Sequence, residues 1–235
     1  MSDSGRRLAQ KLRTAKGRSL SSRRWLERQI NDPFVVEARR QGYRSRAAFK
    51  LAEIDDKHHL LKPGRRVLDL GAAPGGWTQV AVERVRAGEG DGRVLALDIL
   101  EMAPMPGATV MQADFLDDAT PARVHEALGG KVDVVLCDMA PAATGHRDVD
   151  HLRIVGLVEA ALAFAGEVLK PGGAFVAKLT QGGQENQVIA AARGRFASVA
   201  RVKPPASRAE SPEFYIVATG FGARSEEHTS ELQSH

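Results

Sequence analysis

The sequence predicts an α/β protein of three layers, in which a mostly parallel sheet lies between two layers of helices. Three observations predict this fold class. Apolar, β-rich runs alternate with helical stretches, a glycine-rich turn follows the first of these runs, and 43% of the residues are apolar. Strands that alternate with helices of this length are typical of a parallel sheet covered on both faces. At 235 residues the chain is long enough for one such domain with a full hydrophobic core.

Seven runs have the composition of strands, and four longer stretches have the pattern of helices. The expected strands are Val67–Leu70, Arg93–Asp98, Thr109–Gln112, Val132–Cys137, Ala174–Leu179, Ser198–Val202 and Phe214–Ala218. The expected helices are Thr78–Arg86, Pro121–Leu128, Asp150–Leu169 and Gln184–Arg193. The segment Lys170–Gly173, Lys-Pro-Gly-Gly, predicts a helix stop before the fifth strand. No helix separates the last two strands, so we expect them to form an antiparallel hairpin at one edge of the sheet.

The glycine-rich turn at Gly71–Trp77 reads Gly-Ala-Ala-Pro-Gly-Gly-Trp and joins the first strand to the first helix. Glycine lets the main chain take positive φ angles and lets a ligand lie against it. The turn lacks the G-x-G-x-x-G pattern of dinucleotide sites, because Ala73 holds the second glycine position, and no Gly-Lys-Ser/Thr of a P-loop follows. We therefore expect an adenosine-type ligand with little or no phosphate. S-adenosyl-L-methionine fits this description.

The composition excludes several classes of protein. No apolar run approaches the ~20 residues that a membrane span needs, and residues 1–20 lack the apolar core of a secretory signal. The single cysteine, Cys137, excludes a disulfide framework and a cysteine-based zinc site. The histidines show no metal-ligand spacing, although His146 and His151 are candidates for a contact with substrate. We expect a cytoplasmic monomer without a metal and without a membrane partner.

Positive charge is concentrated near the amino terminus, where residues 1–50 carry 14 Lys and Arg against 4 Asp and Glu. Residues 1–20 predict a disordered basic arm. Residues 21–60 predict a basic helical part of a single domain that runs over 21–223, because apolar residues recur there between basic ones. An ordered basic face is typical of proteins that bind a nucleic-acid backbone, so we expect an RNA partner. The basic residues of the ordered part are Arg23, Arg24, Arg28, Arg39, Arg40, Arg44, Arg46 and Lys50.

Residues 224–235 differ in character from the rest of the chain. They have no apolar periodicity and follow a natural stop at Thr219–Gly222. Their sequence resembles the conceptual translation of a sequencing-adapter oligonucleotide, so we expect a non-native tail; the alternative is a short disordered end.

Polar residues end four consecutive strands of the expected sheet. In such sheets ligands bind beyond the carboxyl ends of the strands. At that edge, Asp98 is placed to accept hydrogen bonds from ribose hydroxyls, and Asp114 is placed to contact an adenine amino group. Asp138 ends the fourth strand and Lys178 the fifth. One such residue alone can be a loop acid or a helix cap, but four in succession favour a ligand site.

Five motifs resemble, in type and in order, those of the FtsJ-type ribosomal RNA 2′-O-methyltransferases, over residues 21–222. The resemblance implies a seven-stranded, Rossmann-like methyltransferase fold that uses S-adenosyl-L-methionine. It also implies methyl transfer to the 2′-oxygen of a uridine ribose in large-subunit (23S) ribosomal RNA, late in assembly of the large ribosomal subunit. The motifs are Tyr43–Leu51, Gly71–Trp77, Asp138–Pro141, Ala177–Lys178 and Ser207–Tyr215.

The resemblance also assigns site residues. Its catalytic tetrad of Lys, Asp, Lys and Glu falls on Lys50, Asp138, Lys178 and Glu213. Its cofactor contacts fall on Gly75, Trp77, Asp98, Asp114 and Asp138. Methylation of a ribose hydroxyl needs the oxygen in line with the methyl group and a base for its proton. Lys178, in its neutral form, is the candidate base.

Two positions depart from the family pattern: Ala142 stands where asparagine is common, and Thr180 where an aromatic residue often stands. Alternatives to the expected function also remain. They are a 2′-O-methyltransferase of another RNA, an RNA-binding ribosome-assembly factor with a relict cofactor pocket, and an oxidoreductase or small-molecule methyltransferase on the same sheet. The broken dinucleotide fingerprint and the basic segment disfavour the last. The intact tetrad disfavours the assembly factor.

Overall fold

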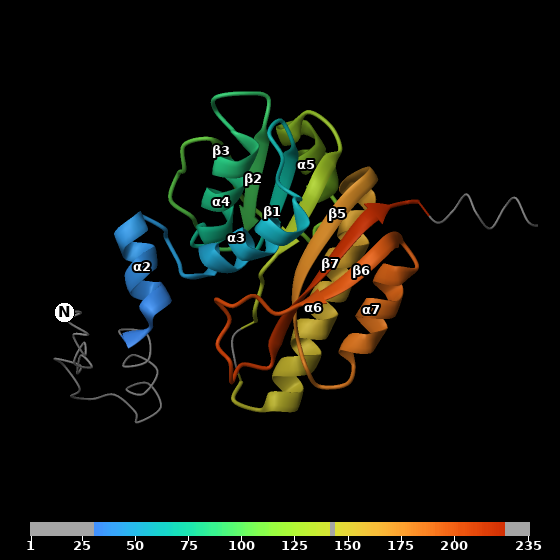
Figure 1. The fold of residues 1–235 in the computed structure, drawn as a ribbon. Coiled ribbons are helices and arrows are strands. Elements are labelled where there is room, and N and C mark those ends of the chain that lie inside the picture. Colours follow the sequence, from blue (N-terminus) through green and yellow to red (C-terminus); the bar gives the residue numbers. More distant parts are fainter. Residues whose placement is uncertain (1–30, 142–143, 224–235) are drawn as a thin grey trace, which may run out of the picture.

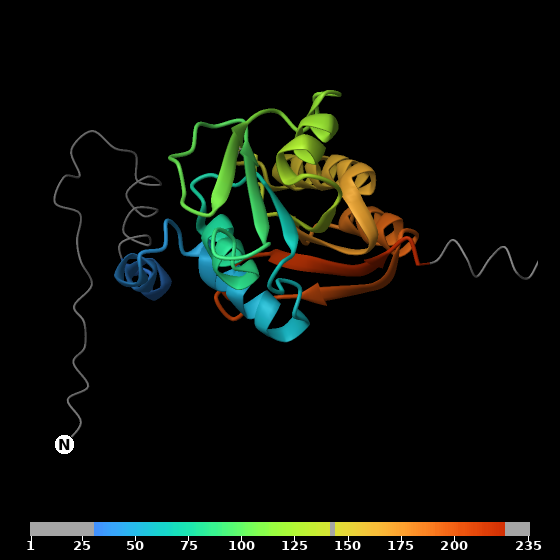
Figure 2. The same cartoon turned by 90° about the horizontal axis from the view of Figure 1, so that it is seen from above.

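The computed structural model describes residues 31–141 and 144–223, which form a seven-stranded sheet with helices on both faces (Figures 1 and 2). The expected arm at 1–20 and tail at 224–235 lie outside the described residues, as do Arg23, Arg24, Arg28 and Ala142. In chain order the elements are α2 (Pro33–Gln41), α3 (Ala47–His58), β1 (Arg66–Leu70), α4 (Gly76–Val85), β2 (Arg93–Asp98), β3 (Ala108–Gln112), α5 (Thr120–Leu128), β4 (Val132–Cys137), α6 (Arg147–Val168), β5 (Leu169–Thr180), α7 (Glu185–Arg193), β6 (Phe196–Val202) and β7 (Glu213–Phe221).

The strand order is β3-β2-β1-β4-β5-β7-β6. The first five of these strands pair in parallel, and β7 pairs antiparallel with both β5 and β6. The predicted fold class and the antiparallel pair at one edge are therefore confirmed. The sequence did not predict which strand of the pair forms the edge; in the structure β7 lies inside the sheet and β6 forms its edge. The burial of the two strands explains this order: every residue of β7 from Phe214 to Ala218 is buried, whereas in β6 only Phe196 is buried and the other residues are exposed or half-buried.

Two apolar layers cover the sheet. Helices α3 and α4 pack on one face, and α5, α6 and α7 pack on the other (Figure 1). Side chains of β1 alternate between these layers, with Val67 facing α3 and α4 and with Leu68 and Leu70 facing the opposite helices. This alternation also turns Asp69 toward the α4 side, where it is buried. Among the described residues, no helix has the length and apolar character of a membrane span.

The expected helix stop before the fifth strand is confirmed, but Lys170–Gly173 belongs to the strand and does not precede it. Helix α6 ends at Val168, and β5 begins at once with Leu169, so this segment forms the first part of the strand. Its pairing with β4 is irregular, because the register shifts between Val132 and Val134. A segment rich in glycine and proline can therefore belong to a strand where its pairing with the neighbouring strand is irregular. Likewise, Lys178 lies two residues inside the end of β5 at Thr180, not at its last position.

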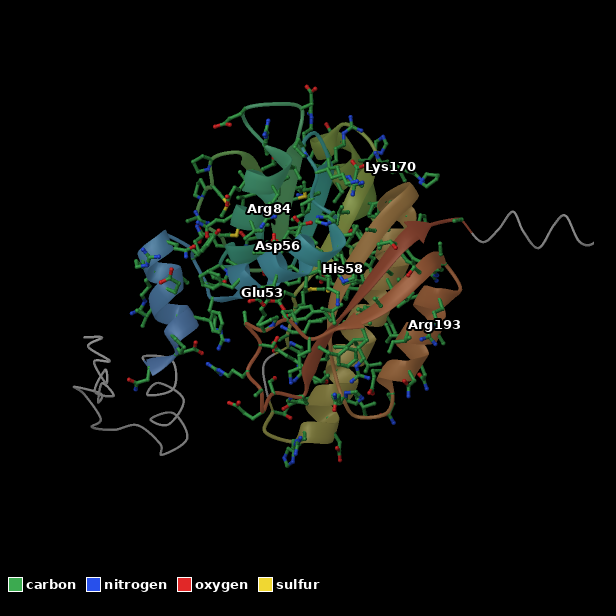
Figure 3. The ribbon with its side chains drawn as sticks, viewed as in Figure 1. Glu53, Asp56, His58, Arg84, Lys170 and Arg193 are labelled. Carbon is green, nitrogen blue, oxygen red and sulfur yellow. The ribbon has the colours of Figure 1, made fainter. Side chains whose placement is uncertain are left out.

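Helices α3 and α4 are joined by polar contacts that orient α3 beside the sheet. Arg84 on α4 forms an ion pair with Asp56 at 2.7 Å (Figure 3) and a longer contact with Asp55 at 3.4 Å. The buried carboxylate of Asp55 also accepts a hydrogen bond from the main-chain N–H of Leu61 at 2.7 Å. It therefore fixes the chain as it leaves α3 toward β1.

Replacing Asp55 by alanine is expected to destabilise the fold by about 1–3 kcal/mol, because the buried N–H of Leu61 then loses its acceptor. Urea-induced unfolding followed by circular dichroism measures this change. Asp55→Asn is the matched control, since its side-chain oxygen still accepts that hydrogen bond, and we expect it to lose clearly less. Equal unfolding midpoints for wild type and Asp55→Ala would contradict this role.

Candidate active site

The glycine-rich turn between β1 and α4 lies at the carboxyl edge of the parallel strands. Gly71 and Gly75 take φ angles of 71° and 109°, which side-chain-bearing residues rarely adopt. A Cβ atom on Gly71 would lie 2.0 Å from Cγ of Met139, and one on Gly75 would lie 2.8 Å from Cε of Met105. The turn therefore depends on both glycines for its conformation and for the close approach of neighbouring loops.

Asp98 holds this turn against the end of β2. Its Oδ2 accepts a hydrogen bond from the N–H of Ala73 at 2.9 Å, and its Oδ1 accepts one from the N–H of Leu100 at 2.8 Å. A carboxylate has about four acceptor positions, so both oxygens can take a further bond. The expected contact of Asp98 with a ribose is compatible with this geometry.

Two other expected cofactor residues, Asp114 and Trp77, differ in their exposure. Asp114 follows β3 and is exposed, and its Oδ1 accepts a hydrogen bond from the N–H of Leu116 at 2.9 Å. The side chain of Trp77, in contrast, is 3% exposed and its indole N–H donates to the carbonyl oxygen of Ala47 at 2.8 Å. The indole is therefore part of the core. The main-chain N–H of Trp77 lies in the first turn of α4, where such groups have no intrahelical acceptor.

Asp69 is a buried acid beneath the turn that the sequence analysis did not single out. Its Oδ2 accepts a hydrogen bond from Oγ1 of Thr78 at 2.7 Å. Burial, helped by the charges of Asp138 and Asp98 and opposed by the hydrogen bond from Thr78, raises the pKa of Asp69 to about 7. Its position at the end of an apolar strand, before the glycines, was the available signal.

The structure brings the four residues of the expected tetrad together in two pairs. Lys178 Nζ lies 3.0 Å from Oδ1 of Asp138 and donates to the main-chain oxygen of the same residue at 2.8 Å. Lys50, in the first turn of α3, forms an ion pair with Glu213 at the start of β7. The register of β5 and β7 places Glu213 opposite Thr180, close to Lys178 on the neighbouring strand.

Tyr215 joins the two pairs and was missed as a site residue. Its hydroxyl donates to Oδ1 of Asp138 at 2.9 Å, and its ring centroid lies 5.7 Å from Nζ of Lys50. Burial, together with the charges of Asp138 and Glu213, raises the pKa of Tyr215 well above its ordinary value. Tyr215 therefore stays a hydrogen-bond donor at neutral pH. Strand alternation was the available signal, because residues 213 and 215 share one face of β7.

Glu213 is held in its charged form. Burial by itself raises the pKa of this carboxyl group, but the ion pair with Lys50, the charge of Lys178 and a hydrogen bond from Ser207 at 3.2 Å outweigh burial. The net effect is a pKa below the ordinary value for glutamate. The site therefore holds the ionised carboxylate of Glu213 beside Lys50, Lys178 and Asp138, at one edge of the sheet and in contact with a buried phenol.

Other reactive side chains near this edge have different environments. Cys137 is fully buried, and burial raises the pKa of its thiol to about 12, so it is not an available nucleophile. His146 is exposed, whereas His151 is buried with Nδ1 3.0 Å from Oγ1 of Thr180. Among the described residues, no group of three or more His, Cys, Asp or Glu side chains could hold a metal ion.

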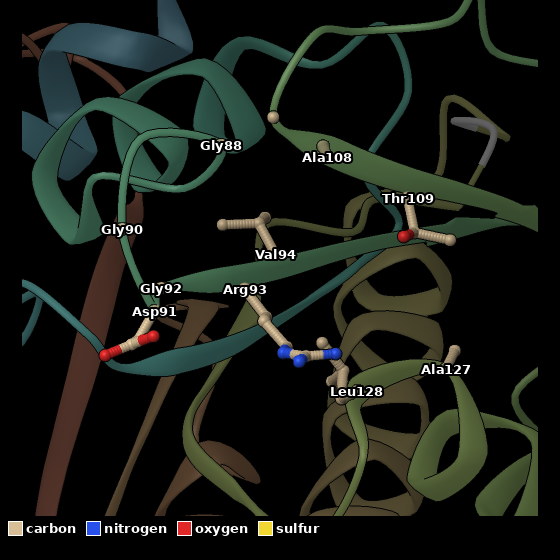
Figure 4. Close-up of a pocket in the computed structure, with 11 residues that line it drawn as sticks. Gly88, Gly90, Asp91, Gly92, Arg93, Val94, Ala108, Thr109, Ala127 and Leu128 are labelled. Atoms are coloured by element: carbon tan, nitrogen blue, oxygen red, sulfur yellow. The ribbon is translucent and has the colours of Figure 1, made fainter.

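A pocket of about 390 Å³, drawn in Figure 4, lies away from these residues. It is at the amino ends of the parallel strands, opposite to the candidate site. It is formed by the glycine turn at 88–92, the first residues of β2 and β3, and the end of α5. Asp91 and Arg93 are its charged side chains. This pocket has no counterpart of the paired lysines and carboxylates, so we place the candidate active site at the carboxyl edge.

The profile of the FtsJ-like methyltransferase family matches residues 43–221. Ribosomal RNA large subunit methyltransferase E of Paramagnetospirillum magneticum is 60% identical over 223 residues, 94% of this chain and 91% of that protein. The protein of the same name from Parvibaculum lavamentivorans is 57% identical over 228 residues, with 94% and 90% covered. The crystal structure of a ribosomal RNA methyltransferase from Plasmodium falciparum matches with a TM-score of 0.69 and 31% identity, over 77% of this chain and 100% of that chain.

Asp69 is expected to make stability fall as the pH rises. Its folded-state pKa of about 7 lies above its ordinary 3.8, so between these values the unfolded chain ionises first and the folded state loses stability. Above about pH 7 the folded state ionises too and the loss levels off, at about 4 kcal/mol or less. Asp69→Asn removes this titration and keeps a polar partner for Thr78. Urea unfolding from pH 4 to 8 measures the difference between the two proteins, and a pH-independent difference would contradict the assignment.

Proposed function

The chain belongs to the FtsJ-like methyltransferase family, and on that premise we propose that it transfers a methyl group from S-adenosyl-L-methionine to the 2′-oxygen of a uridine ribose in large-subunit ribosomal RNA. The observation that carries the proposal is the contact of Lys178 with Asp138 beside the Lys50–Glu213 pair, at the same edge as the glycine-rich turn. The names of the relatives, which refer to methylation of large-subunit ribosomal RNA, support the choice of RNA.

The residues of the turn fit an adenosine-type cofactor without phosphate. Asp98 and Asp114 offer acceptors for ribose hydroxyls and for an adenine amino group, whereas Gly75, the expected main-chain contact, is buried against Met105 and Arg44. Trp77 contributes its main-chain N–H, and Asp138 closes the site on the substrate side. When bound, S-adenosyl-L-methionine supplies a sulfonium methyl group that is already electrophilic.

The methyl acceptor is then positioned and deprotonated by the two pairs of charged residues. A ribose hydroxyl is a poor nucleophile, so a base near its oxygen is needed. Lys178, which Asp138 holds through its carboxylate and its main-chain oxygen, acts in its neutral form and accepts the proton that the 2′-hydroxyl loses on methylation. Lys50 and Glu213 hold the ribose from the other side, and Tyr215 fixes the carboxylate of Asp138. Orientation of this kind lowers the barrier without further chemistry.

We further propose that the protein acts as a cytoplasmic monomer, late in assembly of the large subunit. Two other functions are compatible with the same residues. Methylation of another RNA would keep the tetrad and change the substrate, whereas an RNA-binding assembly factor would not need Lys178 as a base. The two experiments that follow separate these functions.

Lys178→Ala is expected to keep cofactor affinity and to lose turnover by a factor of about 10²–10⁴, because the base is removed. Isothermal titration calorimetry with S-adenosyl-L-methionine and a tritiated-methyl assay measure the two quantities. Lys170→Ala is the matched control, since Lys170 is an exposed lysine at the opposite end of the same strand. Near-normal turnover in Lys178→Ala would contradict the assignment of the base.

The substrate is tested on naked ribosomal RNA, isolated large subunits and whole ribosomes, all from cells that lack the gene. We expect ribose methylation at one uridine of the large-subunit RNA with the wild-type chain and none with Lys178→Ala, as read by reverse-transcription mapping of 2′-O-methyl groups. Calorimetry is expected to detect binding of S-adenosyl-L-methionine and not of NAD. Methylation of a base would exclude an oxygen target. Cofactor binding without methylation of any of the three substrates would favour the assembly factor.

A further inference from the structure

A small basic pocket opens beside the Lys50–Glu213 pair. It has a volume of about 180 Å³ and is lined by Arg46, Lys50, Arg208, Ser211 and Glu213. Pockets that enclose a whole small molecule have volumes of roughly 300–1,000 Å³. This pocket therefore suits one group of a larger ligand, and it lies next to the proposed position of the methyl acceptor.

Asp32 fixes the two arginines of this pocket. Its side chain is 7% exposed, and its Oδ2 forms ion pairs with Arg46 at the start of α3 and with Arg208 Nη2 at 3.0 Å. Its Oδ1 accepts a hydrogen bond from the N–H of Phe34 at 3.0 Å and so caps α2. One buried carboxylate thus connects three segments of the chain.

The loop that carries Arg208 is also held by α3. The N–H of Ala206 donates to Oε2 of Glu53, a residue labelled in Figure 3, at 2.8 Å. The carbonyl oxygen of Ala206 accepts a hydrogen bond from Arg46. Arg46 therefore uses both terminal nitrogens within the protein. Arg208 uses Nε and Nη2 on Asp32, which leaves Nη1 without a partner among the described residues.

The charges around the pocket favour a ligand with a single negative charge. Arg46, Lys50 and Arg208 are opposed by the carboxylates of Asp32 and Glu213, so one net positive charge remains. Guanidinium groups suit phosphate oxygens, because their N–H donors form a planar fork. The hydroxyl group of Ser211, which also lines the pocket, adds a neutral donor.

We propose that this pocket binds the phosphodiester group on the 3′ side of the target ribose, with Arg208 as the direct contact and Asp32 as the positioning residue. The proposal rests on the function proposed above. In RNA the 3′ phosphate is attached to the carbon next to the one that carries the 2′-oxygen, so it is the backbone phosphate nearest the methyl acceptor. Because Lys50 and Glu213 belong to both places, a phosphate in the pocket sets the ribose beside Lys178. Such a contact positions the RNA without reading its bases.

Asp32→Asn separates this proposal from general electrostatic attraction, because the two predict opposite effects. Removing a carboxylate makes the protein more positive, so long-range attraction alone would strengthen binding to RNA. The pocket predicts a KM about tenfold higher, since both arginines lose their common charged acceptor, while kcat changes by less than about twofold. Asparagine caps a helix as well as aspartate does, so α2 is preserved. The probe is the large ribosomal subunit from cells that lack the gene.

Arg208→Gln is expected to raise KM for these subunits about tenfold, again with kcat nearly unchanged. The dependence of log KM on log salt concentration should become less steep by about 0.7–0.9, the effect of one lost phosphate contact. Arg123→Gln is the matched control: it removes one exposed positive charge on α5, away from the pocket, and should change neither quantity. Calorimetry with S-adenosyl-L-methionine and urea unfolding show that each variant is folded.

The side of the ribose is tested by phosphate-ethylation interference. Subunits are ethylated at random, and those that a tagged protein captures are compared with those left unbound. Ethylation of the phosphate 3′ to the methylated nucleotide should prevent capture by the wild type and have little effect on capture by Arg208→Gln. The proposal is overturned if that phosphate is absent from the wild-type pattern, or if Asp32→Asn and Arg208→Gln behave as Arg123→Gln does. A wild-type chain that methylates no ribosomal RNA would instead remove the function on which the proposal rests.

Discussion

The antiparallel pairing of β7 with β5 is the constraint on which the candidate active site depends. It sets Tyr215 opposite Lys178 and Glu213 opposite Thr180. Side chains alternate along a strand, so a shift of one residue would turn Glu213 and Tyr215 to the other face of the sheet. The buried apolar residues of β7 specify the register against both neighbouring strands. Helix α3 then needs only to bring Lys50 over the same face. The pairing of β5 with β7 therefore fixes both the packing of the core and the positions of the candidate site residues.

Each charged side chain at this edge depends on its partner, so the group is better explained as a functional site than as a source of stability for the fold. Two lysines face two carboxylates in partly buried pairs, and removing one partner of such a pair leaves an uncompensated charge. Asp69 adds a further buried acid whose pKa is raised to about 7, mainly by its burial. Groups with perturbed ionisation that gather in one place are typical of functional sites. The same electrostatic arrangement extends to Asp32, which holds two arginines with one carboxylate and leaves the adjoining pocket positively charged.

Much of the fold could be predicted because strand runs, helical stretches and the glycine turn are local patterns. The beginning of β5 could not, since Lys170–Gly173 has the composition of a helix stop and only its pairing with β4 makes it a strand. The tetrad came from a resemblance, and the structure brings its side chains together; their chemical roles stay predictions. Tyr215 was missed because its role depends on a contact with Asp138, 77 positions away. Asp32 was missed for the same reason, since Arg208 lies 176 positions along the chain.

A crystal structure with bound S-adenosyl-L-methionine tests the central claim most directly. The account predicts the ligand in the turn at Gly71–Trp77, with its ribose at Asp98 and its methyl group directed toward Lys178 and Glu213. Two results would contradict it: a ligand bound instead in the glycine-lined pocket at the amino ends of the strands, or a methyl group directed away from these side chains.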